Sequence, residues 1–144
     1  MRLGILDWGI GGLDCMRRIR ERCPNVDLSY VSDAGYRPYG TLDASVLAQR
    51  ISTVTARMNV DRVIVACNAA SAVLDAVDSD LPMEGVIRHG VSAALETGRQ
   101  NIGIVGGRRT IEDQVYGRPL RAAGRSVIEC VAQPLSAHIE AGRL

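Results

Sequence analysis

Short β-branched segments alternate along this chain with longer segments whose apolar residues recur at helical spacing. This alternation is typical of βα units, in which helices connect parallel strands and cover the sheet. It predicts strands at Arg2–Leu6, Asp27–Val31, Arg62–Ala66, Glu84–Ile87, Asn101–Val105 and Ser126–Val131. It predicts helices at Leu13–Arg22, Leu42–Met58, Ser71–Val77, Gly90–Thr97, Thr110–Ala123 and Leu135–Ala141. We therefore expect an α/β fold with a parallel sheet flanked by helices.

The charge balance favours a small-molecule ligand over a large polyanion. The 17 basic and 16 acidic residues are spread without blocks, so no electrostatic footprint for nucleic acid or an anionic membrane is present. No apolar run approaches the roughly 20 residues of a membrane span. Asp7 also comes too early for a signal peptide. These features predict a cytoplasmic protein that contacts neither nucleic acid nor membrane.

Cysteine and lysine usage narrows the chemistry further. The four cysteines lie far apart without a CxxC pair, and only two histidines are present, so neither a zinc site nor a disulfide framework is indicated. Every basic residue is arginine. Pyridoxal phosphate is normally held as a lysine Schiff base, and the Walker A loop needs its lysine. We therefore expect no metal and no cofactor.

Three polar clusters follow predicted strands, where open parallel sheets bind their ligands. They span Asp7 to Gly12, Asp33 to Gly40, and Cys67 to Ser71. Cys67 precedes a predicted helix, and a thiol at a helix N-terminus gains thiolate character. We therefore expect Cys67 to be alkylated faster than Cys15 or Cys23. The alternative is a small buried residue at a strand end.

The remaining polar residues have a functional and a structural interpretation. Asp7 either orients a substrate ammonium and assists the thiol, or caps the glycine-rich turn after it. Asp33 is expected to be structural, whereas the turn Arg37-Pro38-Tyr39-Gly40 suits a carboxylate. Surface, capping or packing roles are expected for the other candidates, which are His89, His138, Cys15, Cys23 and the solvated arginines Arg17, Arg18, Arg20 and Arg22.

Taken in order, these clusters resemble the motifs of the aspartate/glutamate racemase superfamily, and most closely the N-terminal half of glutamate racemase. The resemblance rests on Asp7 with its glycine turn, on Tyr30 to Asp33 with Pro38-Tyr39-Gly40, and on Val65-Ala66-Cys67-Asn68 with Ala70-Ser71. It extends through Gly85-Val86-Ile87, the strand at Ile102-Gly103, Thr110, Tyr116 and the stretch from Pro134 to Gly142. It therefore covers nearly the whole chain.

The resemblance implies a flavodoxin-like lobe over residues 1–98 and the truncated beginning of a similar lobe over residues 99–144. It also implies two-base racemisation of an amino acid without cofactor. Cys67 corresponds to one base, Asp7 to its assisting aspartate, and Glu140 to a glutamate that assists on the other side. Asn68, Pro38, Tyr39 and Gly40 correspond to residues that hold the substrate.

The chain departs from the family pattern at three places. The family's second cysteine and its neighbouring histidine lie beyond Leu144, and Cys130 matches neither. Trp8 replaces a substrate-binding serine, and Ala69 replaces a substrate-binding threonine. Losing both hydroxyls removes hydrogen bonds to the substrate. Trp8 then either accommodates a more apolar side chain or closes the pocket.

Two other functions remain open. A non-catalytic amino-acid-binding module of the same fold fits Trp8, Ala69 and the missing second base. A dinucleotide-binding domain fits Gly9-x-Gly11 and Asp33, but Asp14 stands where its third glycine is needed. A truncated lobe should also expose apolar surface, so we expect strand swapping or a homodimer.

Overall fold

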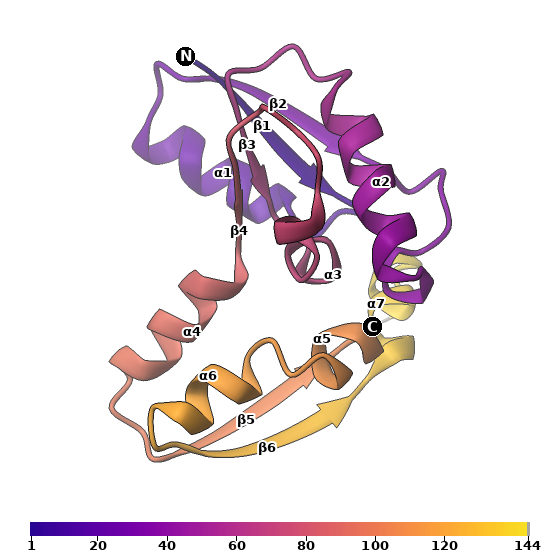
Figure 1. The fold of residues 1–144 in the computed structure, drawn as a ribbon. Helices are drawn as coiled ribbons and strands as arrows, with labels where there is room; N and C mark the ends of the chain where they lie inside the picture. Colours follow the sequence, from indigo (N-terminus) through magenta and orange to yellow (C-terminus); the bar gives the residue numbers. More distant parts are fainter. Residues whose placement is uncertain (144) are drawn as a thin grey trace. The chain divides into compact units, whose positions relative to one another are not determined.

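The computed structural model describes residues 1–143, without the side chains of Pro134, Ser136 and Glu140. The chain forms two compact units, Met1–Val86 and Ile87–Leu144 (Figure 1). The sequence predicted a boundary after residue 98, twelve residues later. The segment in between is a helix that packs within the second unit, because a Cβ on its Gly90 would lie 2.6 Å from Cε1 of Tyr116.

The first unit is built on a parallel sheet with the order β2-β1-β3-β4. Its strands are β1 (Arg2–Asp7), β2 (Asp27–Ser32), β3 (Arg62–Val65) and β4 (Met83–Gly85). Its helices are α1 (Leu13–Arg22), α2 (Ala44–Thr55) and α3 (Asn68–Ser71), with 3-10 turns at Tyr39–Thr41 and Leu74–Ala76. The predicted parallel sheet flanked by helices is thus confirmed. Its strand order is that of flavodoxin-like sheets.

The core of this unit lies between the sheet and α2. β1 is buried from Leu3 through Asp7, as expected for a central parallel strand covered on both faces. α2 contributes Leu47, Ile51 and Val54, whose spacing places them on one face of the helix. They pack in one cluster with strand residues Leu6, Val63 and Val65.

The second unit contains a parallel pair, β5 (Asn101–Gly106) and β6 (Ser126–Val131). Its helices are α4 (Ile87–Glu96), α5 (Arg108–Glu112), α6 (Gly117–Ala122) and α7 (Gln133–Glu140). One face of the pair is solvent-exposed, with Val105 and Ile128 at 65% and 76% exposure. This face of the second unit therefore presents apolar side chains to solvent.

Three predicted elements differ from the structure. The helix predicted over Thr110–Ala123 is two helices, because Gln114 has a φ of 53° between them and ends the first. The helix predicted over Ser71–Val77 is α3 followed by a 3-10 turn, since the Asp- and Ser-containing segment after it favours turns. Ile87, predicted to end a strand, begins α4.

Candidate active site

The strand order of the first unit changes direction between β1 and β3. From β1 the chain moves outward to β2, and it returns on the other side of β1 to form β3 and β4 (Figure 1). This reversal is a topological switch point, where open α/β sheets bind ligands beyond the carboxyl ends of their strands. Asp7 ends β1, and Cys67 lies two residues after β3. The predicted cysteine and aspartate therefore occupy the expected ligand position.

Strand register brings all three polar clusters to this edge. Leu6 pairs with Val65, and its carbonyl accepts the amide of Ala66 at 2.8 Å. On the other side, the carbonyl of Asp7 accepts the amide of Asp33 at 3.0 Å. The carboxyl ends of β1, β2 and β3 thus place the starts of the three clusters at one edge of the sheet in the first unit.

Asp7 is a buried carboxylate that organises the turn after β1. Its Oδ1 accepts the amide of Trp8 at 2.8 Å, and its Oδ2 accepts the amide of Gly12 at 2.9 Å. Gly12 has to be a glycine here, because a Cβ would lie 2.9 Å from Cβ of Ala66. The capping interpretation of Asp7 is confirmed, and its charge also acts on the neighbouring thiol of Cys67.

The thiol of Cys67 is protonated at neutral pH, contrary to the prediction of thiolate character. Burial raises its pKa to about 11, and the negative charge of Asp7 adds to this effect. Hydrogen bonds from the backbone amides of Ala70, Trp8 and Ala69 act in the opposite direction but do not outweigh burial. α3 spans only four residues, so its dipole is weak. Cys67 in this state is a proton donor held beside a carboxylate.

This result reverses the expected order of thiol alkylation. The pKa difference between 9.0 and about 11 lowers the thiolate fraction of Cys67; this reduction is roughly hundredfold. The thiolate of a weaker acid is more nucleophilic, and this offsets the loss in alkylation rate by about tenfold. We expect iodoacetamide at neutral pH to modify the exposed Cys23 and Cys130 about tenfold faster than Cys67, measured by peptide mass spectrometry. Urea-denatured chain is the control and should label evenly, whereas fastest labelling of Cys67 would contradict this pKa.

An ion pair anchors the second cluster. Asp33 accepts hydrogen bonds from Nε and Nη2 of Arg50 at 2.9 and 2.5 Å and from the Tyr39 hydroxyl at 2.7 Å. Burial acts to raise the pKa of Asp33, but Arg50 and Tyr39 outweigh it and hold the pKa below its usual value. The structural role predicted for Asp33 is confirmed. Arg50, which lies on α2, was not among the residues predicted from the sequence.

Trp8 connects the first cluster to the second. Its indole Nε1 donates to the carbonyl of Tyr36 at 3.0 Å, and the guanidinium of Arg50 lies 4.3 Å from the centre of the Tyr36 ring. The sequence offered two outcomes for Trp8, an apolar wall or a closed pocket. In this structure the indole is half-buried against the loop between β2 and α2.

The other predicted substrate-binding residues lie around the same edge. Tyr39 is buried, and burial raises its pKa, as do Asp33 and the nearby Cys67. Gly40 is half-buried and Pro38 is exposed at the 3-10 turn, whose first amides have no acceptor within the turn. Asn68 is exposed at the start of α3, followed by the half-buried Ala69. The side chain of Glu140 lies outside the described residues.

Other candidates from the sequence are peripheral. Cys15 is half-buried. Cys23 is exposed, so the packing role predicted for Cys23 is wrong. His89 and His138 are exposed, as are the four arginines of α1, which confirms their assignment to the surface. Among the described residues, no three histidine, cysteine or acidic side chains are grouped to hold a metal ion. In the same part of the chain, no helix has the length and apolarity to cross a membrane.

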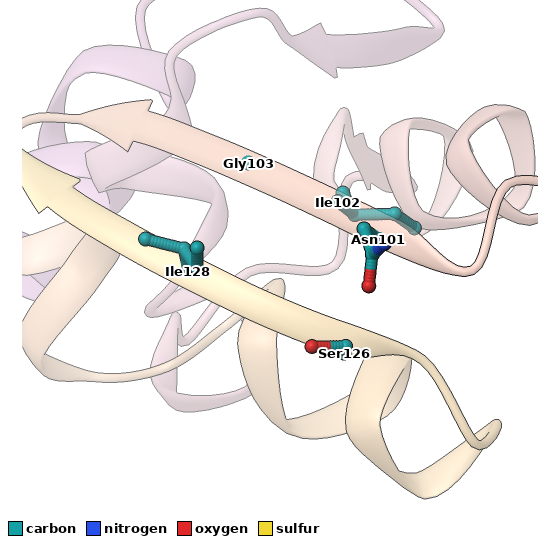
Figure 2. A pocket seen from close by; sticks show the side chains of 5 residues that line it. All are labelled: Asn101, Ile102, Gly103, Ser126 and Ile128. Atoms are coloured by element: carbon teal, nitrogen blue, oxygen red, sulfur yellow. The ribbon is translucent and has the colours of Figure 1, made fainter.

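The second unit carries a shallow depression of about 140 Å³ on its exposed sheet face. Figure 2 shows the lining residues on the two strands, which are Asn101, Ile102, Gly103, Ser126 and Ile128. This lining contains no titratable group. It therefore offers no acid or base, unlike the edge with Asp7 and Cys67.

Comparisons with known proteins identify relatives that are similar in sequence and fold. The chain is 36% identical to the glutamate racemase of Limosilactobacillus reuteri, matching 98% of this chain and 56% of that protein. The glutamate racemase of Aquifex pyrophilus superimposes with a TM-score of 0.83 at 33% identity, covering 91% of this chain and 55% of that one. The glutamate racemase of Francisella tularensis, solved in complex with D-glutamate, superimposes with a TM-score of 0.82 at 26% identity. This match covers 98% of this chain and 56% of that one.

The chain spans about half the length of the curated relatives it matches. No protein-family model matches it. The similarity nevertheless extends over almost all of its residues in both sequence and structure. The chain therefore belongs to the aspartate/glutamate racemase superfamily, in which it is homologous to the N-terminal half of glutamate racemases.

Proposed function

We propose that this chain is the half of a cofactor-independent amino-acid racemase that carries Cys67, one of two cysteine bases. The observation that carries the proposal is the pairing of Cys67 with the buried carboxylate of Asp7 at the switch point between β1 and β3. The relatives support it, since they are named glutamate racemases and one was solved with D-glutamate.

The proposed reaction moves one proton at a time. A thiolate removes the proton from Cα, and the electron pair of the broken C–H bond delocalises into the substrate carboxylate. A thiol on the opposite face then donates a proton to Cα and completes the inversion. Cys67 is ready to act as the donor, because its thiol is protonated at neutral pH. It becomes the base when its proton passes to the neighbouring carboxylate of Asp7.

Substrate positioning is assigned to the residues that surround this pair. The amides of Tyr39 and Gly40 and the side chain of Asn68 hold the amino acid, so that its α-hydrogen faces the sulfur. The resemblance alone assigns an assisting role to Glu140, whose side chain lies outside the described residues. The chain contains no lysine, so it forms no pyridoxal Schiff base itself. Direct proton transfer by the Cys67 thiol requires no Schiff base.

Solvent exchange tests this function. The chain should incorporate deuterium from D2O at Cα of one enantiomer of its substrate, because Cys67 reaches only one face. The measurement is the loss of the α-proton signal by NMR, with chiral chromatography to follow inversion. We expect exchange without inversion in the 144-residue chain, since the second base is not assigned to any of its residues. No exchange in any amino acid would contradict the proposal.

A non-catalytic amino-acid-binding module is the second candidate. The apolar residues Trp8 and Ala69 favour it, because they stand where the family has substrate-binding hydroxyls. It predicts saturable binding of an amino acid without α-proton exchange, so the same experiment separates the two functions. Assembly into a homodimer and a cytoplasmic location stay predictions.

A further inference from the structure

Three polar side chains near Cys67 already bond to other parts of the first unit. The Trp8 indole donates to the carbonyl of Tyr36, and the Tyr39 hydroxyl donates to Asp33 at 2.7 Å. The Ser71 hydroxyl donates to the carbonyl of Val65 at 2.9 Å and accepts the amide of Val86 at 3.1 Å. Each group is thus engaged in holding strands and loops together.

The residues next to the sulfur have apolar side chains. The amides that bond to Cys67 belong to Trp8, Ala69 and Ala70. Trp8 and Ala69 pack against the hydrophobic core, to which Ala70 itself belongs. The hydrogen-bonding group in these three side chains is the indole N–H, which Tyr36 occupies. Ala70 is fully buried, whereas Trp8 and Ala69 are only half-buried, so their exposed apolar surface forms a wall beside an amino acid bound at Cys67.

Such a wall discriminates between charged and uncharged substrate side chains. A carboxylate that leaves water for an apolar surface loses hydration without gaining a partner. An aliphatic group of the same length gains free energy from the same transfer. Arg50 cannot compensate the charge, because its guanidinium is bonded to Asp33.

We propose that this site selects amino acids with an uncharged side chain and that Trp8 is the residue that determines this specificity. The inference rests on the proposed function, because it names the substrate class of the same site. The proposed substrate class differs from glutamate, the amino acid in the names of this chain's relatives.

Binding of two matched amino acids tests the inference. Glutamate and norvaline have side chains of equal length, and only glutamate carries a terminal charge. Trp8 is the sole tryptophan of the chain, so its fluorescence reports binding at this site directly. We expect norvaline to bind the 144-residue chain at least about tenfold more tightly than glutamate.

Three variants test whether the apolar wall causes the preference for norvaline over glutamate. Binding is followed by ¹H–¹⁵N NMR titration. Trp8→Ser opens the wall and adds a hydroxyl, so it should shift the preference toward glutamate by about tenfold. Trp8→Phe is the matched comparison, because it keeps an apolar ring of smaller size and lacks the N–H that bonds to Tyr36; it should keep a preference for norvaline. Ala69→Ser adds a hydroxyl at a smaller residue and should shift the preference in the same direction if Trp8→Ser does not fold.

Two results overturn the inference. One is glutamate binding to the wild-type chain as tightly as norvaline. The other is an unchanged preference in the folded Trp8→Ser and Ala69→Ser variants. Either result leaves the proposed racemase intact, because that function is judged by α-proton exchange and not by the choice of side chain.

Discussion

Replacing Cys67 by serine is expected to lower the rate of α-proton exchange by about 10² to 10⁴-fold, the usual contribution of a positioned acid or base. Serine has nearly the same size as cysteine, but its hydroxyl is a far weaker acid than a thiol. It can neither donate a proton readily at neutral pH nor pass one to Asp7. The measurement is the rate of α-proton loss in D2O by NMR, with the amino acid that the wild-type chain exchanges fastest.

The control variants for this experiment are Cys23→Ser and Cys130→Ser. Both cysteines are exposed and lie outside the site, so these changes should leave the exchange rate unchanged. Circular dichroism establishes that Cys67→Ser remains folded. Exchange in Cys67→Ser within about twofold of the wild-type rate would assign the reaction to another base.

The fold was predictable where local pattern and burial agree. The buried run of β1 and the apolar face of α2 are visible in the sequence, and both were predicted close to their observed positions. The break between α5 and α6 was not predictable, because it depends on the positive φ of Gln114. Asparagine or glycine would have indicated such a turn, whereas glutamine gives no comparable signal.

The site was predictable in outline for a related reason. Carboxyl ends of parallel strands share one edge of the sheet, so the positions of Asp7 and Cys67 in the sequence indicated their convergence. The pKa of Cys67 was not predictable, because it depends on how deeply the tertiary structure buries the sulfur. Arg50 was missed for a similar reason, since its partner Asp33 is seventeen residues away in the loop after β2.

The Arg50–Asp33 pair is expected to be a large contributor to the stability of the first unit. Arg50→Met keeps the length of the side chain but leaves the carboxylate of Asp33 buried beside Tyr39 with no cation. Because Arg50 is itself 27% exposed at the side chain, we expect a loss at the low end of the range for buried pairs. The free energy of unfolding should fall by about 3 kcal/mol, measured by urea denaturation with Trp8 fluorescence.

The matched control is Arg18→Met, which breaks a pair with Asp14 in which both side chains are more than half exposed. It should cost less than about 1 kcal/mol. The double variant Arg50→Met/Asp33→Asn should recover much of the loss, because it removes the buried charge and keeps an acceptor for Tyr39. Equal losses in Arg50→Met and Arg18→Met would contradict a structural role for the Arg50–Asp33 pair.

The pH dependence supplies a separate test of the same pair. In the wild type the pKa of Asp33 lies below its ordinary value of 3.8, so the stability from this pair is fully present above that pH. It is lost as the pH falls through the pKa of the folded state. In Arg50→Met, burial is no longer opposed by the cation, and protonating Asp33 relieves the buried charge. The stability gap between the two proteins should therefore narrow below about pH 4, whereas a gap that stays constant there would show that Arg50 acts through packing alone.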